Sequence, residues 1–240
     1  MNAVSVANLS VELGGRTVLS DINMEVAEGW IAGIMGPNGG GKTTLLRAIL
    51  GMLRPSSGGI RVFGLEPKDA VKKGLVGYLP QRQGKSLLPL TALEAVRIGG
   101  RSGKREAIAA LQTVGMAEHA GRSFWELSGG QAQRVSLARV MVDKPKLMLL
   151  DEPSTGIDTV SQEDFYKLLL KLRAETGVTV ILTSHDVGAI SSYVDQVFCL
   201  NIRLHCHGSA SACLTRERLS ELYGREVDII RHQEPEDEHT

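Results

Sequence analysis

The chain has 240 residues, 42% of them hydrophobic, and a formal net charge of zero. That length fits one large domain, or one domain with an inserted lobe, and the balanced charge offers no general basic field for nucleic acid. No apolar run approaches the ~18 residues needed to cross a bilayer, and residues 1–19 lack the basic start and apolar core of a signal peptide. We therefore expect a cytoplasmic protein, attached to a membrane at most through a partner.

The chain opens with two loosely alternating segments, Val4–Leu13 and Thr17–Val26. Gly14 and Gly15 stand between them and are typical turn residues. Alternation on both sides of such a turn predicts an antiparallel hairpin, which we expect to pack on the rest of the fold.

Four later runs are short, apolar and continuous rather than alternating. They are Trp30–Met35, Leu75–Leu79, Leu147–Leu150 and Val178–Thr183. Such runs are typical of parallel strands that are buried on both faces. Helical patterns lie between them, so the sequence predicts βα units and a largely parallel sheet.

From about residue 83 to residue 143 no convincing strand is found. Three helices are expected there, over Leu90–Ile98, Lys104–Val114 and Gln131–Val142. We interpret this stretch as a helical lobe inserted into the α/β domain. After Gly224 the chain turns polar and then acidic, which is typical of a mobile tail.

A glycine-rich segment follows the first continuous run, and Gly36–Thr43 satisfies the pattern G-x-x-x-x-G-K-[ST] between a predicted strand and a predicted helix. Its glycines let backbone N–H groups approach phosphates, and the helix adds its positive N-terminal end. Lys42 is placed to reach the β and γ phosphates and Thr43 to hold Mg²⁺. The alternative, a flexible glycine turn, would not explain why the segment lies between a predicted strand and a predicted helix. The segment therefore predicts a nucleoside triphosphate site.

Polar residues follow each of the four runs at the place where parallel strands bind ligands. Asp151 and Glu152 follow Leu150, and the pair fits a Mg²⁺ anchor beside a group that orients or deprotonates water. Gln81 and Ser184-His185-Asp186 follow two other runs. Each has a plain structural alternative when taken alone, a solvated turn or a hydrogen-bonded histidine. Because the carboxyl ends of parallel strands share one edge, we expect these residues to converge.

The segment Leu127-Ser128-Gly129-Gly130-Gln131 precedes a predicted helix. Ser128 is a good N-cap, and the two glycines leave backbone N–H groups uncovered. An ordinary capped helix start is the alternative. If this segment binds an anion, it is a second anion site in the chain, although one nucleotide needs only one phosphate loop.

Taken together and in this order, the motifs resemble those of ABC-type ATPases, the nucleotide-binding subunits of ATP-driven transporters. The resemblance covers nearly all of residues 3–224 and adds a D-loop at Ser154–Asp158. It implies an α/β P-loop NTPase fold with a RecA-like parallel-sheet core, an N-terminal antiparallel β subdomain and an inserted α-helical subdomain. The implied divisions are a core at 3–82 and 144–224, a helical subdomain at 83–143 and a tail at 225–240.

The resemblance also implies ATP hydrolysis with Mg²⁺ by a head-to-tail homodimer. Glu152 would be the general base, His185 would hold the γ phosphate and the water, and Gln81 would touch Mg²⁺ or the water. Thr43 and Asp151 would complete the metal ligands, and Asp158 would lie across the dimer interface. The expected nucleotide contacts are Gly36, Pro37, Asn38, Gly39, Gly40, Gly41, Lys42, Thr43 and Thr44 of one copy, with Ser128, Gly129, Gly130 and Gln131 of the other.

One position departs from the family pattern. Relatives usually carry an aromatic residue near the start of the hairpin, where it stacks on adenine, and here the corresponding residue is Leu13. An apolar contact would replace stacking, which leaves the selection of ATP over GTP less well defined.

The finer resemblance is to the ATPases of bacterial zinc and manganese importers. It rests on segments 77–81, 88–91, 153–158 and 197–201. It implies a peripheral subunit on the cytoplasmic face of the inner membrane, bound to an integral membrane permease that works with an extracytoplasmic metal-binding protein. An importer of another substrate, a non-transport ABC ATPase and a solitary P-loop kinase or GTPase are the alternatives. Partner helices are expected to dock beside Gln81 and residues 87–99, although packing within the helical lobe would also explain the apolar residues there.

The three cysteines, Cys199, Cys206 and Cys213, are an odd number, which argues against a secreted disulfide framework. His205, Cys206, His207 and Cys213 are residue types that suit Zn²⁺. However, on a strand the two histidines would share one face and Cys206 the other. An ordinary strand with a turn is therefore favoured, and a regulatory metal site is the alternative.

Overall fold

The computed structural model describes residues 1–81, 90–98, 100–186, 188 and 191–223. Its first element is the expected hairpin, β1 (Asn2–Leu13) and β2 (Arg16–Ala27), which confirms that prediction. Gly14 and Gly15 have φ angles of 57° and 75°. Two consecutive left-handed residues give the turn whose twist matches a two-residue hairpin. The third strand of this antiparallel sheet, β4 (Ser57–Val62), pairs with β1 and was not expected from the sequence.

The second sheet has six strands in the order β5-β6-β7-β3-β8-β9. Its first five strands run parallel and β9 is antiparallel to β8. The bounds are β3 (Ile31–Met35), β5 (Val76–Leu79), β6 (Leu147–Leu150), β7 (Thr179–Ser184), β8 (Gln196–Asn201) and β9 (Arg203–Gly208). The four predicted buried runs are β3, β5, β6 and β7, so the predicted parallel core is confirmed.

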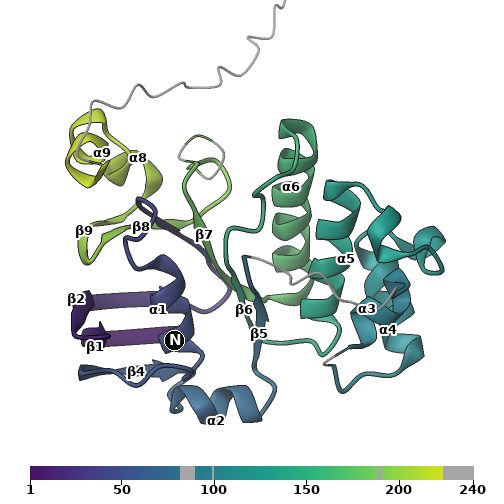
Figure 1. Ribbon diagram of the computed structural model, residues 1–240, viewed down its shortest axis with the longest axis horizontal. Helices are drawn as coiled ribbons and strands as arrows, with labels where there is room; N and C mark the ends of the chain where they lie inside the picture. Colours follow the sequence, from purple (N-terminus) through teal and green to yellow (C-terminus); the bar gives the residue numbers. More distant parts are fainter. Residues whose placement is uncertain (82–89, 99, 187, 189–190, 224–240) are drawn as a thin grey trace, which may run out of the picture.

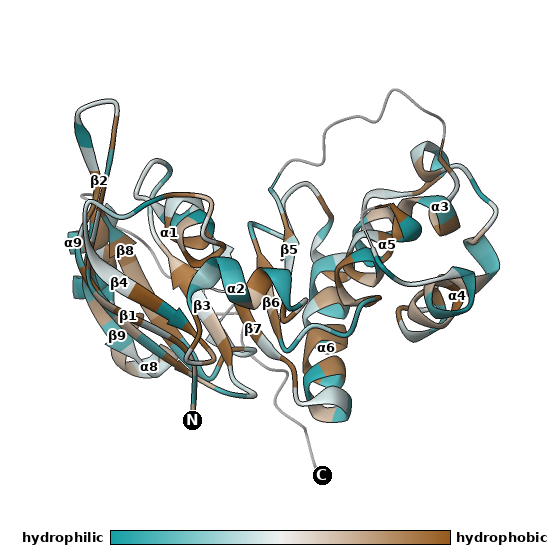
Figure 2. Ribbon diagram, turned by 90° about the horizontal axis from the view of Figure 1, so that it is seen from below, coloured by the Kyte–Doolittle hydropathy of each residue, from teal (hydrophilic) through white to brown (hydrophobic). Residues whose placement is uncertain are grey.

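The strands β3, β6 and β7 at the middle of the six-stranded sheet are buried on both faces, which explains their continuous apolar sequences. Met148 and Leu150 of β6 belong to a cluster shared with the helices, whereas Leu147 and Leu149 belong to a cluster shared with β1, β2 and α1 (Lys42–Ile49). Figure 1 shows the antiparallel sheet and α1 on one side of the central strands and the helices α3 to α6 on the other. Figure 2 shows hydrophobic residues along β6 and β7 between these layers.

The helical lobe begins, in the described residues, after Leu90. Its elements are α3 (Ala92–Arg97), α4 (Lys104–Thr113), the short 3-10 helices η1 (Ala117–His119) and η2 (Phe124–Glu126), and α5 (Gly129–Met141). The three expected helices are confirmed, and no strand lies between residues 90 and 143 in the part of this stretch that the structure describes. The expected boundary at residue 83, residues 87–89 and 99 of the expected docking segment, and the tail at 225–240 lie outside the described residues.

The remaining helices frame the sheet. They are α2 (Pro67–Lys72), α6 (Thr159–Thr176), α8 (Ala210–Cys213) and α9 (Arg216–Tyr223). Asp158 caps the start of α6 and the left-handed Gly177, with φ of 69°, ends it. No helix of the described ranges is long and apolar enough to cross a membrane.

The cysteines lie together where β8, β9 and α8 meet. Cys206 and Cys213 form a disulfide with their Cα atoms 5.8 Å apart, and Cys199 is a buried free thiol. The disulfide was not expected, because the short connection from β9 to α8 carries no distinctive cysteine spacing. Cys206 is buried while His205 and His207 are both exposed, as the alternation predicted. Among the described residues no group of three or more His, Cys, Asp or Glu is arranged to hold a metal ion. The regulatory metal site raised from the sequence therefore has no support in the structure.

Candidate functional site

The phosphate loop connects β3 to α1 and is pressed against the end of β8. A Cβ atom at Gly36 would lie 1.9 Å from the Leu200 carbonyl oxygen, so only glycine fits there. The Ile202 N–H donates to the Gly40 carbonyl at 3.0 Å, which ties the loop to the β8–β9 turn. Gly41, with φ of 99°, provides no side-chain cap for α1. The first turn of α1 therefore keeps backbone donors that no side chain covers, the arrangement that binds anions at helix starts.

Lys42 is buried within this loop, with 5% of its surface exposed. Its Nζ donates to the Gly36 carbonyl at 2.8 Å and to the Pro37 carbonyl at 3.1 Å, and lies 3.7 Å from Glu152 Oε1. Burial lowers the pKa of Lys42, and the nearby carboxylates of Glu152 and Asp151 oppose that shift. The ammonium group thus points to the side of the loop where the acidic pair lies. Thr43 and Thr44 follow it, half-buried, in the first turn of α1.

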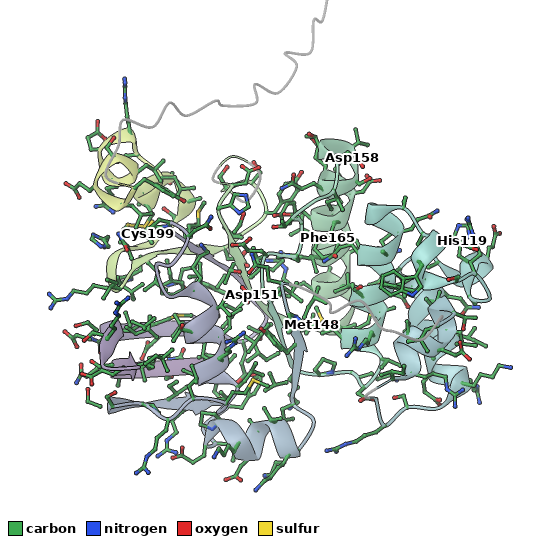
Figure 3. All side chains as sticks on the ribbon, in the orientation of Figure 1. His119, Met148, Asp151, Asp158, Phe165 and Cys199 are labelled. Carbon is green, nitrogen blue, oxygen red and sulfur yellow. A yellow bond between two sulfur atoms is a disulfide. The ribbon has the colours of Figure 1, made fainter. Side chains whose placement is uncertain are left out.

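Asp151 and Glu152 follow β6 and are both buried. Asp151 Oδ1 accepts from the Thr183 hydroxyl at 2.8 Å, and Thr183 Oγ1 in turn accepts from the Glu152 N–H at 2.8 Å. The Tyr78 hydroxyl lies 3.5 Å from Asp151 Oδ2. Burial raises the pKa of Tyr78, and the negative charge of Asp151 raises it further. Figure 3 places Asp151 at the centre of the molecule, where the parallel strands end.

Three of the residues predicted from separate strands converge on the Glu152 carboxylate. Gln81 Nε2 donates to Glu152 Oε2 at 2.7 Å, His185 Nδ1 lies 3.5 Å from the same oxygen, and Lys42 approaches Oε1. The Thr155 hydroxyl also donates to Oε2, at 3.2 Å. Glu152 has φ of 47°, a left-handed conformation that a non-glycine residue holds only when its surroundings fix it. The structure thus brings the strand-end residues together as expected.

The donor set at this edge fits Mg²⁺. Asp151 offers a carboxylate, Thr43 a hydroxyl and Gln81 the amide oxygen that its bond to Glu152 leaves free. These are the hard oxygen ligands that Mg²⁺ prefers, and Mg²⁺ commonly takes only one or two carboxylates together with substrate phosphates. The residues present therefore match the expected ion.

The segment Ser128–Gln131 starts α5 with a capping box. The Ser128 hydroxyl accepts from the Gln131 N–H at 3.3 Å, and Gln131 Oε1 accepts from the Ser128 N–H at 3.1 Å. Cβ atoms at Gly129 and Gly130 would lie 3.2 Å from Ile157 Cγ2 and 2.9 Å from Ser161 Oγ. The glycines therefore also let α5 pack closely against the start of α6, a role that the sequence did not reveal.

Two further predicted residues lie away from the central carboxylates. Asp158 is exposed at the start of α6 in Figure 3, where it accepts from the Ser161 N–H at 2.9 Å, and that hydrogen bond lowers its pKa. Leu13 ends β1, pairs with Arg16 at the hairpin turn and is 43% exposed. Within one chain, the contacts of the Ser128 segment run to α6 and η1 rather than to the phosphate loop.

Several residues that shape the site were given no individual role from the sequence, although Thr155 lies in the expected D-loop and Leu200 in segment 197–201. Thr183 links Asp151 to the Glu152 backbone, Thr155 contacts the Glu152 carboxylate, and Leu200 fixes the shape of the phosphate loop. Each acts through a contact between segments far apart in the chain or through a hydroxyl in an ordinary turn. Only the position of Thr183 at the end of a continuous run hinted that it faces the same edge.

A glycine loop between a strand and a helix, with carboxylates at the end of a neighbouring parallel strand, defines a P-loop nucleotide-binding protein. The ABC transporter family matches residues 19–155. The chain therefore belongs to the ABC transporter family. It is 38% identical to the zinc import ATP-binding protein ZnuC of Cereibacter sphaeroides over 226 residues, which cover 93% of this chain and 89% of the relative.

Solved structures agree with this assignment. The cbiO1 protein of Clostridium perfringens, part of an ABC transporter complex, superposes with a TM-score of 0.81 at 27% identity and covers 92% of this chain and 93% of its own. The dimeric post-hydrolysis state of an ATP-binding cassette bound to ADP and Pi gives a TM-score of 0.74 at 27% identity, over 86% of this chain and 98% of that one. The predicted ABC-ATPase fold is thus confirmed.

Proposed function

We propose that this chain is the ATP-hydrolysing subunit of a transporter that imports zinc through a partner membrane permease. The observation that supports hydrolysis best is the convergence of Lys42, Gln81 and His185 on the buried carboxylate of Glu152. The cargo is supported by relatives that carry the name zinc import ATP-binding protein over more than nine tenths of this chain. In this role the subunit would sit on the cytoplasmic face of the membrane, held there by the permease.

The proposed reaction begins with ATP phosphates on the backbone donors of residues 36–43. Lys42 exchanges its contacts with the Gly36 and Pro37 carbonyls for the β and γ phosphates. Thr43, Asp151 and the Gln81 amide oxygen would hold Mg²⁺, which supplies charge neutralisation for the phosphates when bound. The buried setting strengthens these electrostatic contacts by excluding water.

Glu152 then accepts a proton from the attacking water, and the oxygen of that water bonds to the γ phosphorus. The bond from that phosphorus to the bridging oxygen breaks, which gives ADP and inorganic phosphate. Gln81 and Thr155 orient the carboxylate through Oε2, and Thr183 fixes the backbone of the same residue. His185, close to that oxygen, orients the γ phosphate and the water.

A second copy is proposed to complete the site. Ser128–Gln131 is a helix start with uncovered backbone donors, and it lies on the helical side of the molecule, apart from the phosphate loop of its own chain. In a head-to-tail dimer it would face the γ phosphate on the partner copy, with Asp158 beside it. Closure of this dimer around ATP is the movement that a permease can use.

Complementary inactive variants test the arrangement across two chains. Lys42→Ala damages the phosphate loop and Ser128→Arg blocks the helix start, so each homodimer should be inactive. A mixed dimer keeps one intact site, formed by the phosphate loop of the Ser128→Arg chain and the helix start of the Lys42→Ala chain. We expect mixing to restore ATPase activity. A mixture as inactive as its components would overturn the proposed dimer site.

Metal accumulation in cells tests the cargo. In a strain from which the gene is deleted, the parent gene should restore zinc uptake at limiting zinc, and the Lys42→Ala gene should not. Restoration of manganese uptake with no change in zinc would replace zinc by manganese as the cargo. Restoration of neither metal would overturn the import of a divalent metal while leaving the ATPase assignment intact.

A further inference from the structure

The buried face of α6 carries one hydroxyl that its packing does not require. Tyr166 is 1% exposed and lies among apolar residues of the same helix, Phe165, Leu169 and Leu172. Its ring stacks on Tyr193 with centroids 5.1 Å apart and an interplanar angle of 16°. A phenylalanine would fill this volume equally well, whereas a buried tyrosine hydroxyl needs a polar partner. The reason for a tyrosine at this position therefore lies with the partners of its hydroxyl.

The first partner belongs to the segment that follows the two acidic residues. The Tyr166 hydroxyl lies 3.0 Å from Ser154 Oγ, which also accepts from Gln162 Nε2 at 3.2 Å. Two side chains of α6 thus anchor Ser154. The next residue, Thr155, donates to Glu152 Oε2. A shift of Ser154 would therefore move a direct partner of the Glu152 carboxylate.

The electrostatic surroundings of the Tyr166 hydroxyl also include the end of β7. Burial raises the pKa of Tyr166, and polar contacts of its hydroxyl with Ser154, Gln162 and Ser184 oppose that shift. Ser184 precedes His185, and its hydroxyl accepts from the Asp186 N–H at 2.9 Å. The Tyr166 hydroxyl thus contacts the segment that follows Glu152 and lies near the end of β7, and the Glu152 and His185 side chains that follow these strands meet at 3.5 Å.

We propose that Tyr166 is a positioning residue for ATP hydrolysis, whose hydroxyl holds Ser154 in place so that Thr155 keeps the Glu152 carboxylate oriented towards the attacking water. The inference rests on the proposed ATPase function. Tyr166 touches neither Glu152 nor the phosphate loop in the described contacts, so it acts through Ser154 and Thr155. It should affect the chemical step more than the binding of ATP.

The test is the steady-state ATPase activity of the purified full-length chain with Tyr166→Phe. This change keeps the ring, its stacking and its volume. Loss of one buried hydrogen bond corresponds to a factor of about 3 to 10 in an equilibrium or a rate. We therefore expect kcat to fall about 3- to 10-fold while KM for ATP stays within about twofold. A purely structural role would instead lower the melting temperature and leave the kcat of the folded protein unchanged.

Tyr223→Phe is the matched control, because the Tyr223 hydroxyl is buried and has no hydrogen-bond partner in the part of the chain that the structure describes. It should leave kcat unchanged. A double variant tests whether Tyr166 acts through Ser154. Ser154→Ala should also lower kcat, and the double variant Ser154→Ala with Tyr166→Phe should lose no more kcat than the stronger single variant, because both changes break the same contact.

If the parent chain hydrolyses ATP, three results would overturn the inference about Tyr166 without affecting the proposed function. They are a Tyr166→Phe kcat equal to that of the parent, an equal loss in Tyr223→Phe, and losses in the double variant that multiply. A parent chain with no ATPase activity would overturn the proposed function, and the inference with it.

Discussion

The shape of the phosphate loop depends on Gly36 more than on Gly39, and two alanine substitutions test this. A Cβ atom at Gly36 would lie 1.9 Å from the Leu200 carbonyl oxygen, whereas real Cβ atoms do not approach below 3.0 Å. The strand β8 is hydrogen-bonded to β3 on one side and β9 on the other, so it cannot easily move away. The loop itself must therefore move, by about 1 Å, which is enough to break well-aligned hydrogen bonds to a phosphate.

The expected magnitude follows from the hydrogen bonds that this movement would break. Charge-assisted hydrogen bonds contribute about 1.5–3 kcal/mol each, so misplacing two backbone donors costs about 3 kcal/mol or more. Gly36→Ala should therefore weaken ATP binding about 100-fold or more. Gly39→Ala is the control, since Gly39 has φ of 82° but its Cβ would meet nothing within 4 Å. It carries only the strain of a left-handed alanine, about 1–2 kcal/mol, and should weaken binding about 10-fold.

Titration of each variant with a fluorescent ATP analogue gives the two dissociation constants, and thermal melting confirms that both variants are folded. If Gly36→Ala binds the nucleotide as well as Gly39→Ala does, the close approach of Leu200 does not control the loop and the reasoning is refuted.

Three other predictions concern the acidic centre and the thiols. Gln81→Ala removes the 2.7 Å hydrogen bond to Glu152 Oε2 and should lower kcat about 10-fold or more with little change in KM; a raised KM at constant kcat would assign Gln81 to binding instead. Without reductant, the unfolded chain should react with one equivalent of maleimide, at Cys199, and with three after reduction; three in both cases would exclude the Cys206–Cys213 disulfide. Burial raises the pKa of Cys199 from 9.0 to about 11. The stability that the buried, protonated thiol contributes to the folded state should therefore be complete below pH 9 and be lost as the pH rises towards 11. Denaturant unfolding at pH 8 and pH 11, compared with Cys199→Ala, measures this loss, and an equal pH dependence in both proteins would contradict it.

The parts of the fold that the sequence predicted are those encoded locally. Continuous apolar runs identified β3, β5, β6 and β7, and alternation around Gly14-Gly15 identified the hairpin. The rule that parallel strands end at one edge then brought Gln81, Glu152 and His185 together correctly. In contrast, β4 was missed because Gly58 and Gly59 are unusual in a strand, and its pairing with β1 depends on residues far away in the chain.

The parts of the site that the sequence did not predict depend on contacts between distant segments. Thr183 bonds to Asp151 across 32 positions, and Leu200 meets Gly36 only because β8 lies beside β3. Ser128 and the glycines after it were interpreted through their exposed backbone donors, whereas the structure shows that the glycines also allow contact with Ile157 and Ser161. The disulfide was unexpected for the same reason, since the short return from β9 to α8 has no signature of its own.

The proposal that Glu152 is the base for hydrolysis in a closed dimer is the central claim, and one variant tests it most directly. Glu152→Gln keeps the size of the side chain and its contacts with Gln81 and Thr155 but cannot accept the proton. In size-exclusion chromatography with ATP and Mg²⁺, the Glu152→Gln variant should bind ATP and elute as a dimer. In an ATPase assay it should hydrolyse ATP at about 1% of the parent rate or less, which is within the range of rate losses that follow removal of a general base. Hydrolysis by Glu152→Gln at the parent rate would contradict the account.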